Sequence, residues 1–222
     1  MFKAVLFDLD GTLIATTRLY LECYRRALAP FCGRELSDDE LLALKPRSEV
    51  RLLRAQVGDA RLAACLDAFY GHYRELHASH FEGVCAGVPT LLDALRSAGR
   101  RLGIITGKSR RAWEITSERA PLGAFDVLVF DDDVAAPKPD PEGIRRALAQ
   151  LGLRPEQSIY IGDTIGDVRA ALAAGAAAGA VLWPKAERER DGFRGKAAAE
   201  GALVFDTPAA VADTIITSGA DP

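Results

Sequence analysis

The sequence predicts an α/β fold in which helices cover both faces of a parallel sheet, with an all-helical segment inserted after the first strand. The chain opens with an apolar run over residues 1–7, interrupted only by Lys3 and followed by a turn. Residues 15–82 then show only helical periodicity, with apolar side chains three and four positions apart. From about residue 84 onward, strands and helices alternate, as they do around a parallel sheet.

The inserted segment divides into several expected helices. The first covers about residues 16–31, where apolar side chains recur at helical spacing. A second begins after Ser37, because Ser37 and Glu40 have the spacing of a capping box. Further helices are expected over about residues 48–57 and 59–81.

The remaining chain supplies the expected sheet and its covering helices. Strands are expected over about residues 101–105, 127–130, 158–161, 180–182 and 203–205. Helices are expected over about residues 89–98, 109–119, 141–151 and 165–174. We therefore predict a core domain of residues 1–14 and 83–222, and a helical cap domain of residues 15–82.

Two aspartates mark the end of the first strand. Because side chains alternate along a strand, Asp8 and Asp10 are expected to project to the same side. Two carboxylates a few ångströms apart resist joint ionisation, so they require either a shared proton or a bound cation. The first suits acid–base chemistry and the second suits phosphoryl transfer. A simple strand end with a capping Asp and a Gly turn would explain Asp10 and Gly11, but not Asp8.

Other polar residues also follow strands directly, and parallel strands end at one edge of a sheet. Ligands of open α/β sheets bind outside that edge. The side chains expected to converge there are Asp8, Asp10, Thr106, Lys138 and Asp163. The Thr106 hydroxyl and the Cβ-free backbone of Gly107 suit a phosphate, although Thr106 could instead cap the following helix. Flanking prolines restrict the backbone at Lys138, which favours a positioned ammonium over a merely solvated one.

Four segments resemble the motifs of the haloacid dehalogenase (HAD) superfamily of phosphatases. They are residues 7–12 (Phe-Asp-Leu-Asp-Gly-Thr), 106–108 (Thr-Gly-Lys), 137–141 (Pro-Lys-Pro-Asp-Pro) and 162–167 (Gly-Asp-Thr-Ile-Gly-Asp). The resemblance covers nearly the whole chain and is greatest with phosphoglycolate phosphatases and related pyrophosphatases. It implies a Rossmann-like catalytic core with an inserted helical cap.

The resemblance also implies a role for each matching residue. Asp8 is the expected nucleophile, and Asp10 the acid and base. The expected Mg²⁺ ligands are Asp8, the main-chain carbonyl of Asp10, and Asp163. Thr106, Gly107 and Lys138 are expected to bind the phosphoryl group, with Thr106 and Lys138 stabilising its charge during transfer. Asp167 is expected to support the metal ligands or to contact Lys138, although two acids at a helix start could also serve as capping residues.

The function implied is a Mg²⁺-dependent phosphatase that hydrolyses a small phosphomonoester, similar to phosphoglycolate, through an aspartyl phosphate. Two enzymatic alternatives stay open: a sugar-phosphate mutase of the β-phosphoglucomutase type and an inorganic pyrophosphatase. Such mutases tend to carry a histidine near the position of Tyr20, which favours a phosphatase. Asp10 argues against a dehalogenase, since superfamily dehalogenases usually lack this second aspartate. A receiver-like signalling module, the non-enzyme alternative, would need only about half this length.

Specificity is expected from the cap, because the core residues face only the phosphoryl group. Residues 44–48 are a candidate loop in which Lys45 and Arg47 could pair with a carboxylate or a second phosphate of the substrate. A solvated helix boundary before Pro46 is the alternative. The expected partner is a small phosphorylated metabolite.

Composition excludes several other partners. The net charge is -3, from 28 basic and 31 acidic residues, which leaves no electrostatic footprint for nucleic acid or an anionic membrane. No stretch approaches the roughly 20 apolar residues of a membrane span. The four cysteines fit no zinc spacing and are expected to be reduced thiols, so we predict a cytoplasmic protein. The oligomeric state cannot be derived from the sequence.

Two further groups are assigned to solvent. The histidines at 72, 77 and 80 are interpreted as solvated helix residues and not as a metal site. Residues 131–133, three aspartates, are interpreted as a hydrated loop and not as a second cation site.

Overall fold

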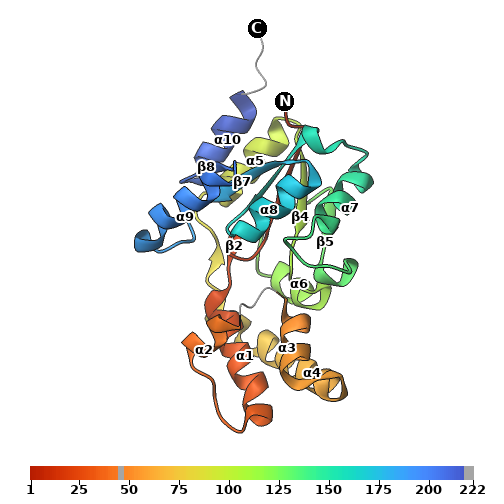
Figure 1. Ribbon diagram of the computed structural model, residues 1–222, viewed down its shortest axis with the longest axis vertical. Helices are drawn as coiled ribbons and strands as arrows, with labels where there is room; N and C mark the ends of the chain where they lie inside the picture. Colours follow the sequence, from red (N-terminus) through yellow and green to blue (C-terminus); the bar gives the residue numbers. More distant parts are fainter. Residues whose placement is uncertain (45–47, 218–222) are drawn as a thin grey trace.

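The structure, a computed structural model, describes residues 1–44 and 48–217. Figure 1 shows a twisted sheet with helices on both faces, and further helices gathered beyond one end of the sheet. Within the described residues, no helix is long and apolar enough to cross a membrane.

The sheet has six parallel strands in the order β5-β4-β1-β6-β7-β8. Their bounds are Ala4–Phe7 (β1), Arg101–Ile105 (β4), Val127–Val129 (β5), Ser158–Gly162 (β6), Ala177–Val181 (β7) and Leu203–Phe205 (β8). The central strand β1 is completely buried, as expected of a strand with helices on both sides. Phe7 pairs with Ile104 on one neighbour and Ile161 on the other, so all three strands end within one residue of the same level.

Alternation along β1 divides the core into two apolar layers. Val5 and Phe7 face the layer under α5 (Val88–Ser97) and α10 (Pro208–Thr217). Ala4 and Leu6 face the opposite layer. The helices of that second layer are α7 (Glu142–Leu151), α8 (Ile165–Ala174) and α9 (Glu187–Ala199). The predicted α/β fold is therefore confirmed.

The helices beyond the sheet are α1 (Thr17–Cys32), α2 (Asp38–Ala43), α3 (Glu49–Val57) and α4 (Asp59–His80), and we call them the cap helices. They have their own apolar core, which includes a cluster of aromatic rings from α1 and α4. Ser37 and Glu40 form the predicted capping box of α2. The cap core extends to Ala112 and Ile115 of α6 (Arg110–Ser117), which follows β4.

Three features differ from the sequence-based expectation. Strands β2 (Ile14–Ala15) and β3 (Gly83–Val84) form an antiparallel pair where the chain enters and leaves the cap helices. Two-residue strands are too short to produce a recognisable alternation. Strand β7 begins earlier than predicted, because its alanines and glycine carry no β-branched signal. Helix α10 was not predicted, although it starts at Pro208, a residue favoured in the first helical turn.

His77 is buried, so its assignment to solvent was wrong. Only 2% of its surface is exposed, and its ring packs between Tyr73 and Phe81. Among the described residues, neither ring nitrogen has a hydrogen-bond partner. Burial, together with the positive charges of Arg119 and Lys108, lowers the pKa of His77 to about 4.

Replacing His77 by Leu should remove an acid-sensitive component of stability. The unfolded histidine binds a proton near pH 6.5 and the folded one only near pH 4, so its contribution is complete above pH 6.5 and is lost as the pH falls towards 4. Between pH 7 and 4.5, the unfolding free energy of wild type should fall by about 2–3 kcal/mol more than that of His77→Leu. Urea unfolding across this range measures the difference. The half-buried His72 provides a control, and an equal effect of His72→Gln would contradict the interpretation.

Candidate active site

One pocket at the carboxyl edge of the sheet contains all the residues that the sequence placed in the catalytic core site. Asp8 follows β1, Thr106 and Gly107 follow β4, and Asp163 follows β6. The lining residues that had been predicted are Asp8, Asp10, Thr106, Gly107, Lys138, Asp163 and Asp167. Lys45 and Arg47, the candidates for specificity, lie outside the described residues.

Lys138 lies between two carboxylates. Its Nζ atom is 2.6 Å from Oδ1 of Asp8 and 2.6 Å from Oδ1 of Asp167. It also donates to the Tyr160 hydroxyl at 2.7 Å, and that hydroxyl donates to the Ile105 carbonyl. Although burial opposes the charge, Asp167 and Asp8 hold the pKa of Lys138 well above its usual value.

Asp167 has two structural tasks at once. Its Oδ2 atom accepts from the backbone and the hydroxyl of Thr164, which forms the capping box of α8. Its Oδ1 atom faces Lys138. The predicted contact and the alternative capping role therefore coexist on one side chain. Burial opposes ionisation of Asp167, but the Lys138 ion pair and the Thr164 hydrogen bonds lower its pKa.

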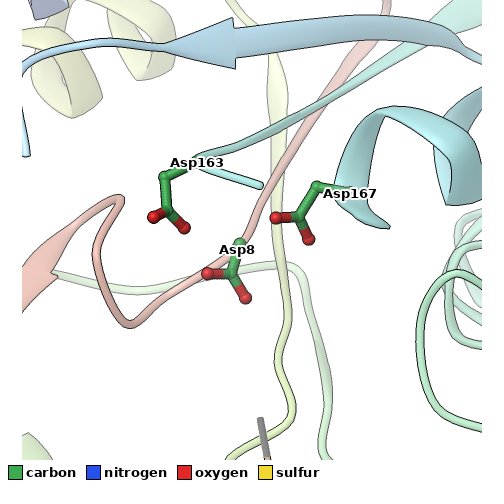
Figure 2. Close-up of side chains that lie close together, drawn as sticks. All are labelled: Asp8, Asp163 and Asp167. Atoms are coloured by element: carbon green, nitrogen blue, oxygen red, sulfur yellow. The ribbon is translucent and has the colours of Figure 1, made fainter. Parts of the chain in front are cut away.

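The carboxylates of Asp8, Asp163 and Asp167 face a common space, as Figure 2 shows. One oxygen from each lies within 4.8 Å of the others. Burial raises the pKa of Asp163 to about 6, and Asp167 adds to the shift. Burial also raises the pKa of Asp8 well above its usual value. The positive charge of Lys138 lowers this pKa, whereas the negative charges of Asp167 and Asp163 raise it further. Such a group of hard oxygen donors fits a divalent cation such as Mg²⁺.

The turn after β1 lies directly against Asp163. A Cβ atom added to Gly11, which has a φ of +81°, would lie 3.0 Å from Oδ2 of Asp163. Only a glycine combines this backbone conformation with this close approach. The main chain beside Asp10 is thereby brought close to Asp163. The Asp10 carboxylate itself contacts Thr16 and Lys108 instead. Lys185, which sequence reasoning missed, lies 3.4 Å from Oδ2 of Asp163.

The Asp10 carboxylate faces the cap side of the pocket. Its Oδ1 atom accepts from the Thr16 hydroxyl at 2.6 Å and lies 3.1 Å from Nζ of Lys108. The Thr106 hydroxyl accepts from the Lys108 backbone, and Ser109 caps α6, so Thr106 is not the helix cap. Lys108 was not singled out from the sequence, although its position directly after Thr106-Gly107 was a usable signal.

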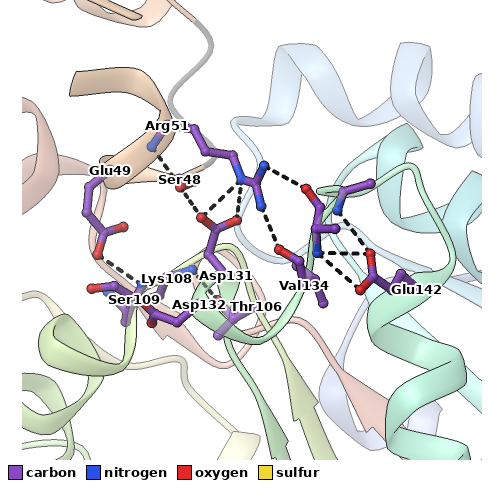
Figure 3. A network of polar contacts seen from close by, with 12 residues as sticks. Ser48, Glu49, Arg51, Thr106, Lys108, Ser109, Asp131, Asp132, Val134 and Glu142 are labelled. Carbon is purple, nitrogen blue, oxygen red and sulfur yellow. Dashed lines mark hydrogen bonds and ion pairs between the residues drawn. The ribbon is translucent and has the colours of Figure 1, made fainter. Parts of the chain in front are cut away.

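The start of α3 is bound to the core, as Figure 3 shows. Ser48 donates to Asp131 at 2.7 Å, and Glu49 accepts from the backbone of Ser109 at 2.9 Å. Arg51 pairs with Asp131 at 2.9 Å and donates to the Val134 carbonyl. Asp131 is only 6% exposed, so its assignment to a hydrated loop was wrong. No local sequence signal connects Arg51 with Asp131, because 80 residues separate them.

Comparison with known proteins decides the family. Residues 5–181 match the haloacid dehalogenase-like hydrolases. The chain belongs to this family. Pyrophosphatase PpaX of Bacillus velezensis is 38% identical over 185 residues, which cover 81% of this chain and 83% of the relative. PpaX of Bacillus cereus (strain AH820) is 29% identical over 82% of this chain and 83% of the relative.

Solved structures of other proteins share the fold. CbbY from Rhodobacter sphaeroides in complex with phosphate superposes with a TM-score of 0.77 at 26% identity, over 94% of this chain and 96% of CbbY. A protein described as a predicted phosphoglycolate phosphatase, from Haemophilus somnus, superposes with a TM-score of 0.78 at 21% identity, over 98% of both chains. The predicted membership of the HAD superfamily, in its phosphatase branch, and the prediction of an enzyme are confirmed.

Gly162→Ala should displace Asp167. The added Cβ would lie 2.4 Å from Cγ of Asp167, a distance that forces this side chain away from Lys138. We expect a loss of about 1–3 kcal/mol in unfolding free energy, together with reduced turnover. Gly71→Ala is the matched control, because nothing lies within 4 Å of its new Cβ. Urea unfolding and turnover measure both variants; a Gly162→Ala protein indistinguishable from wild type would contradict the packing described here.

Proposed function

We propose that this HAD-family enzyme is a Mg²⁺-dependent phosphatase that hydrolyses a small phosphomonoester through an aspartyl phosphate at Asp8. One observation carries the proposal: the buried Asp8 carboxylate lies beside the Lys138 ammonium within a group of three acids. Asp8 therefore has the Lys138 ammonium on one side, and on the other the carboxylate oxygens of Asp163 and Asp167, which could help to bind a metal ion. This arrangement supports nucleophilic attack on a phosphoryl group.

Mg²⁺ would be held by Asp8, the main-chain carbonyl of Asp10, and Asp163. When bound, it screens the carboxylates from the phosphoryl oxygens. Asp167 supports this set by holding Lys138 in place. We also propose the division into a core of residues 1–14 and 83–222 and a cap of residues 15–82, and a cytoplasmic location.

The reaction proceeds in two displacements. An oxygen of Asp8 attacks phosphorus and forms an O–P bond, while the bond to the leaving oxygen breaks. Asp10 gives its proton to that oxygen. Asp10 then takes a proton from water, the water oxygen bonds to phosphorus, and the bond to Asp8 breaks. Thr106, the backbone at Gly107, and Lys138 stabilise the charge on the transferred oxygens.

Inorganic pyrophosphate is the second candidate substrate, because the PpaX relatives are named for it. A sugar phosphate is supported by the structure of CbbY in complex with xylulose-1,5-bisphosphate, which superposes with a TM-score of 0.76 at 26% identity over 94% of this chain and 96% of CbbY. Tyr20 stands where the mutases tend to carry a histidine, and its hydroxyl accepts from Lys108. The absence of a histidine at this position favours hydrolysis over mutase chemistry. The receiver-like module is set aside, since the chain belongs to a hydrolase family.

Asp8→Asn should abolish turnover while preserving the fold. The amide keeps the shape of the side chain but is a poor nucleophile, so kcat should fall by at least about a thousandfold. Phosphate release measures turnover, and mass spectrometry of acid-quenched wild type should find one phosphoryl group on the peptide containing Asp8. Chelation of divalent cations should also stop turnover, and Mg²⁺ should restore it. The exposed Asp213→Asn is the control, and normal turnover in Asp8→Asn would refute the proposal.

A substrate panel separates the remaining candidates. Phosphoglycolate, sugar phosphates and pyrophosphate are compared by kcat/KM with Mg²⁺ present. We expect the highest value for a small phosphomonoester such as phosphoglycolate. Cleavage of pyrophosphate alone would replace the proposal with a pyrophosphatase. Transfer of the phosphoryl group within a sugar, without phosphate release, would identify a mutase.

A further inference from the structure

A second lysine, Lys108, lies between the sheet and the cap helices and has no part in the mechanism described so far. Its side chain has no exposed surface. Its Nζ atom lies 2.7 Å from the Tyr20 hydroxyl on α1, 2.9 Å from the Tyr73 hydroxyl on α4, and 3.1 Å from Oδ1 of Asp10. A buried charge is costly unless it is paired and hydrogen-bonded, and this ammonium is both.

In each of the three contacts of Lys108, the ammonium is the hydrogen-bond donor. An ammonium carries three N–H donors and no acceptor, so the two tyrosine oxygens must accept. The Tyr73 hydroxyl also contacts the Thr116 hydroxyl at 2.8 Å, which provides a second anchor. Burial raises the pKa of Tyr20 and of Tyr73, so both phenols stay protonated. Although burial opposes the charge of Lys108, Asp10 and Tyr73 raise its pKa above the usual value.

The Asp10 oxygen that lies beside the Lys108 ammonium is the same one that accepts a hydrogen bond from the Thr16 hydroxyl. Oδ1 is therefore held by two donors, one from the loop after β4 and one from the start of the cap segment. The carboxylate lines both the pocket that contains Asp8 and the adjoining pocket that contains Tyr20 and Glu49. It thus stands between the site of the phosphoryl group and the space beside the cap helices.

We propose that Lys108 is a positioning residue for Asp10. By holding Oδ1, it directs Oδ2 to the leaving oxygen. Because two of its anchors lie on α1 and α4, the position of Asp10 depends on the cap helices. The inference rests on the proposed phosphatase function.

A direct contact between Lys108 and the phosphoryl group fits the structure less well. Among the described residues, Lys108 lines the adjoining pocket that contains Tyr20 and Glu49, whereas Lys138 lines the pocket that contains Asp8 and keeps 18% of its side-chain surface exposed. An anion would have to displace Tyr20, Tyr73 or Asp10 to reach the Lys108 ammonium.

The test compares leaving groups. An alkyl ester needs a proton from Asp10 as its bond to phosphorus breaks, whereas p-nitrophenolate leaves without one. The ratio kcat/KM covers only the steps through phosphoenzyme formation, so it isolates the first displacement. In Lys108→Met, kcat/KM for the best alkyl ester of the panel should fall about a hundredfold, and that for p-nitrophenyl phosphate should fall far less. The exposed Lys196→Met is the matched control.

Tyr20→Phe provides a milder second variant. It removes one acceptor from Lys108 but keeps the ring, so the ratio of alkyl to aryl kcat/KM should fall in the same direction by a smaller factor. In the Lys108→Met background, Tyr20→Phe should have no further effect on this ratio, because Tyr20 acts through Lys108. Should Lys108→Met fail to fold, the ratio in Tyr20→Phe decides the question by itself.

Several outcomes would overturn the inference. If both esters lose kcat/KM equally in a folded Lys108→Met protein, and inorganic phosphate inhibits less well, Lys108 binds the phosphoryl group instead. An unchanged ratio in Tyr20→Phe would exclude coupling through the tyrosine. If wild type cleaves neither ester, the proposed phosphatase function fails together with this inference. If wild type is active and Asp8→Asn is not, the phosphatase function stands, and the ratio of alkyl to aryl kcat/KM then tests the role of Lys108 alone.

Discussion

The ion pairs of Lys138 with Asp8 and Asp167 are the interaction on which the rest of the site depends. Three carboxylates meet at the end of the sheet, those of Asp8 and Asp167 buried and that of Asp163 partly exposed, and each raises the cost of ionising the others. One ammonium in contact with two of them offsets part of that cost. Burial is the main reason why the pKa values of Asp8 and Asp163 are raised, and the neighbouring carboxylates add to the shift. A divalent cation bound by these oxygens would offset the remaining repulsion between the carboxylates.

The order of the strands brings these charges together. Strand β1 lies between β4 and β6, and their aligned ends place Asp8 beside Thr106 and Asp163. Two close backbone approaches complete the arrangement. Gly11 lets the turn after β1 lie against Asp163, and Gly162 leaves room for the Asp167 side chain. The site is thus a product of sheet topology and of two positions where a Cβ atom does not fit.

The core site could be predicted from the sequence because its residues follow recognisable strands. Asp8, Thr106 and Asp163 each follow an apolar run, and parallel strands end at one edge. The contacts between the cap helices and the core could not be predicted, because they depend on how two separately formed parts meet. Asp131 was assigned to solvent as one of three consecutive acids, yet it is buried under Arg51. Tyr160 lies within an otherwise apolar strand, where its hydroxyl gave no local sign of a partner at Lys138.

The short loop from Thr106 to Ser109 contacts both the pocket that contains Asp8 and the cap helices, through consecutive residues. Thr106 and Gly107 line the pocket that contains Asp8, whereas Lys108 and Ser109 bind the cap helices. Because the backbone of Lys108 donates to the Thr106 hydroxyl, a shift of the cap helices would be transmitted over two residues to Thr106. The contacts that this loop makes with the cap helices are polar and include Glu49, Tyr20 and Tyr70. Separation would let water replace each partner at once, so no buried charge would be left unpaired. Ala112 and Ile115 of α6 also join the apolar core of the cap helices, so separation would expose apolar surface as well, and the polar contacts alone do not set its cost.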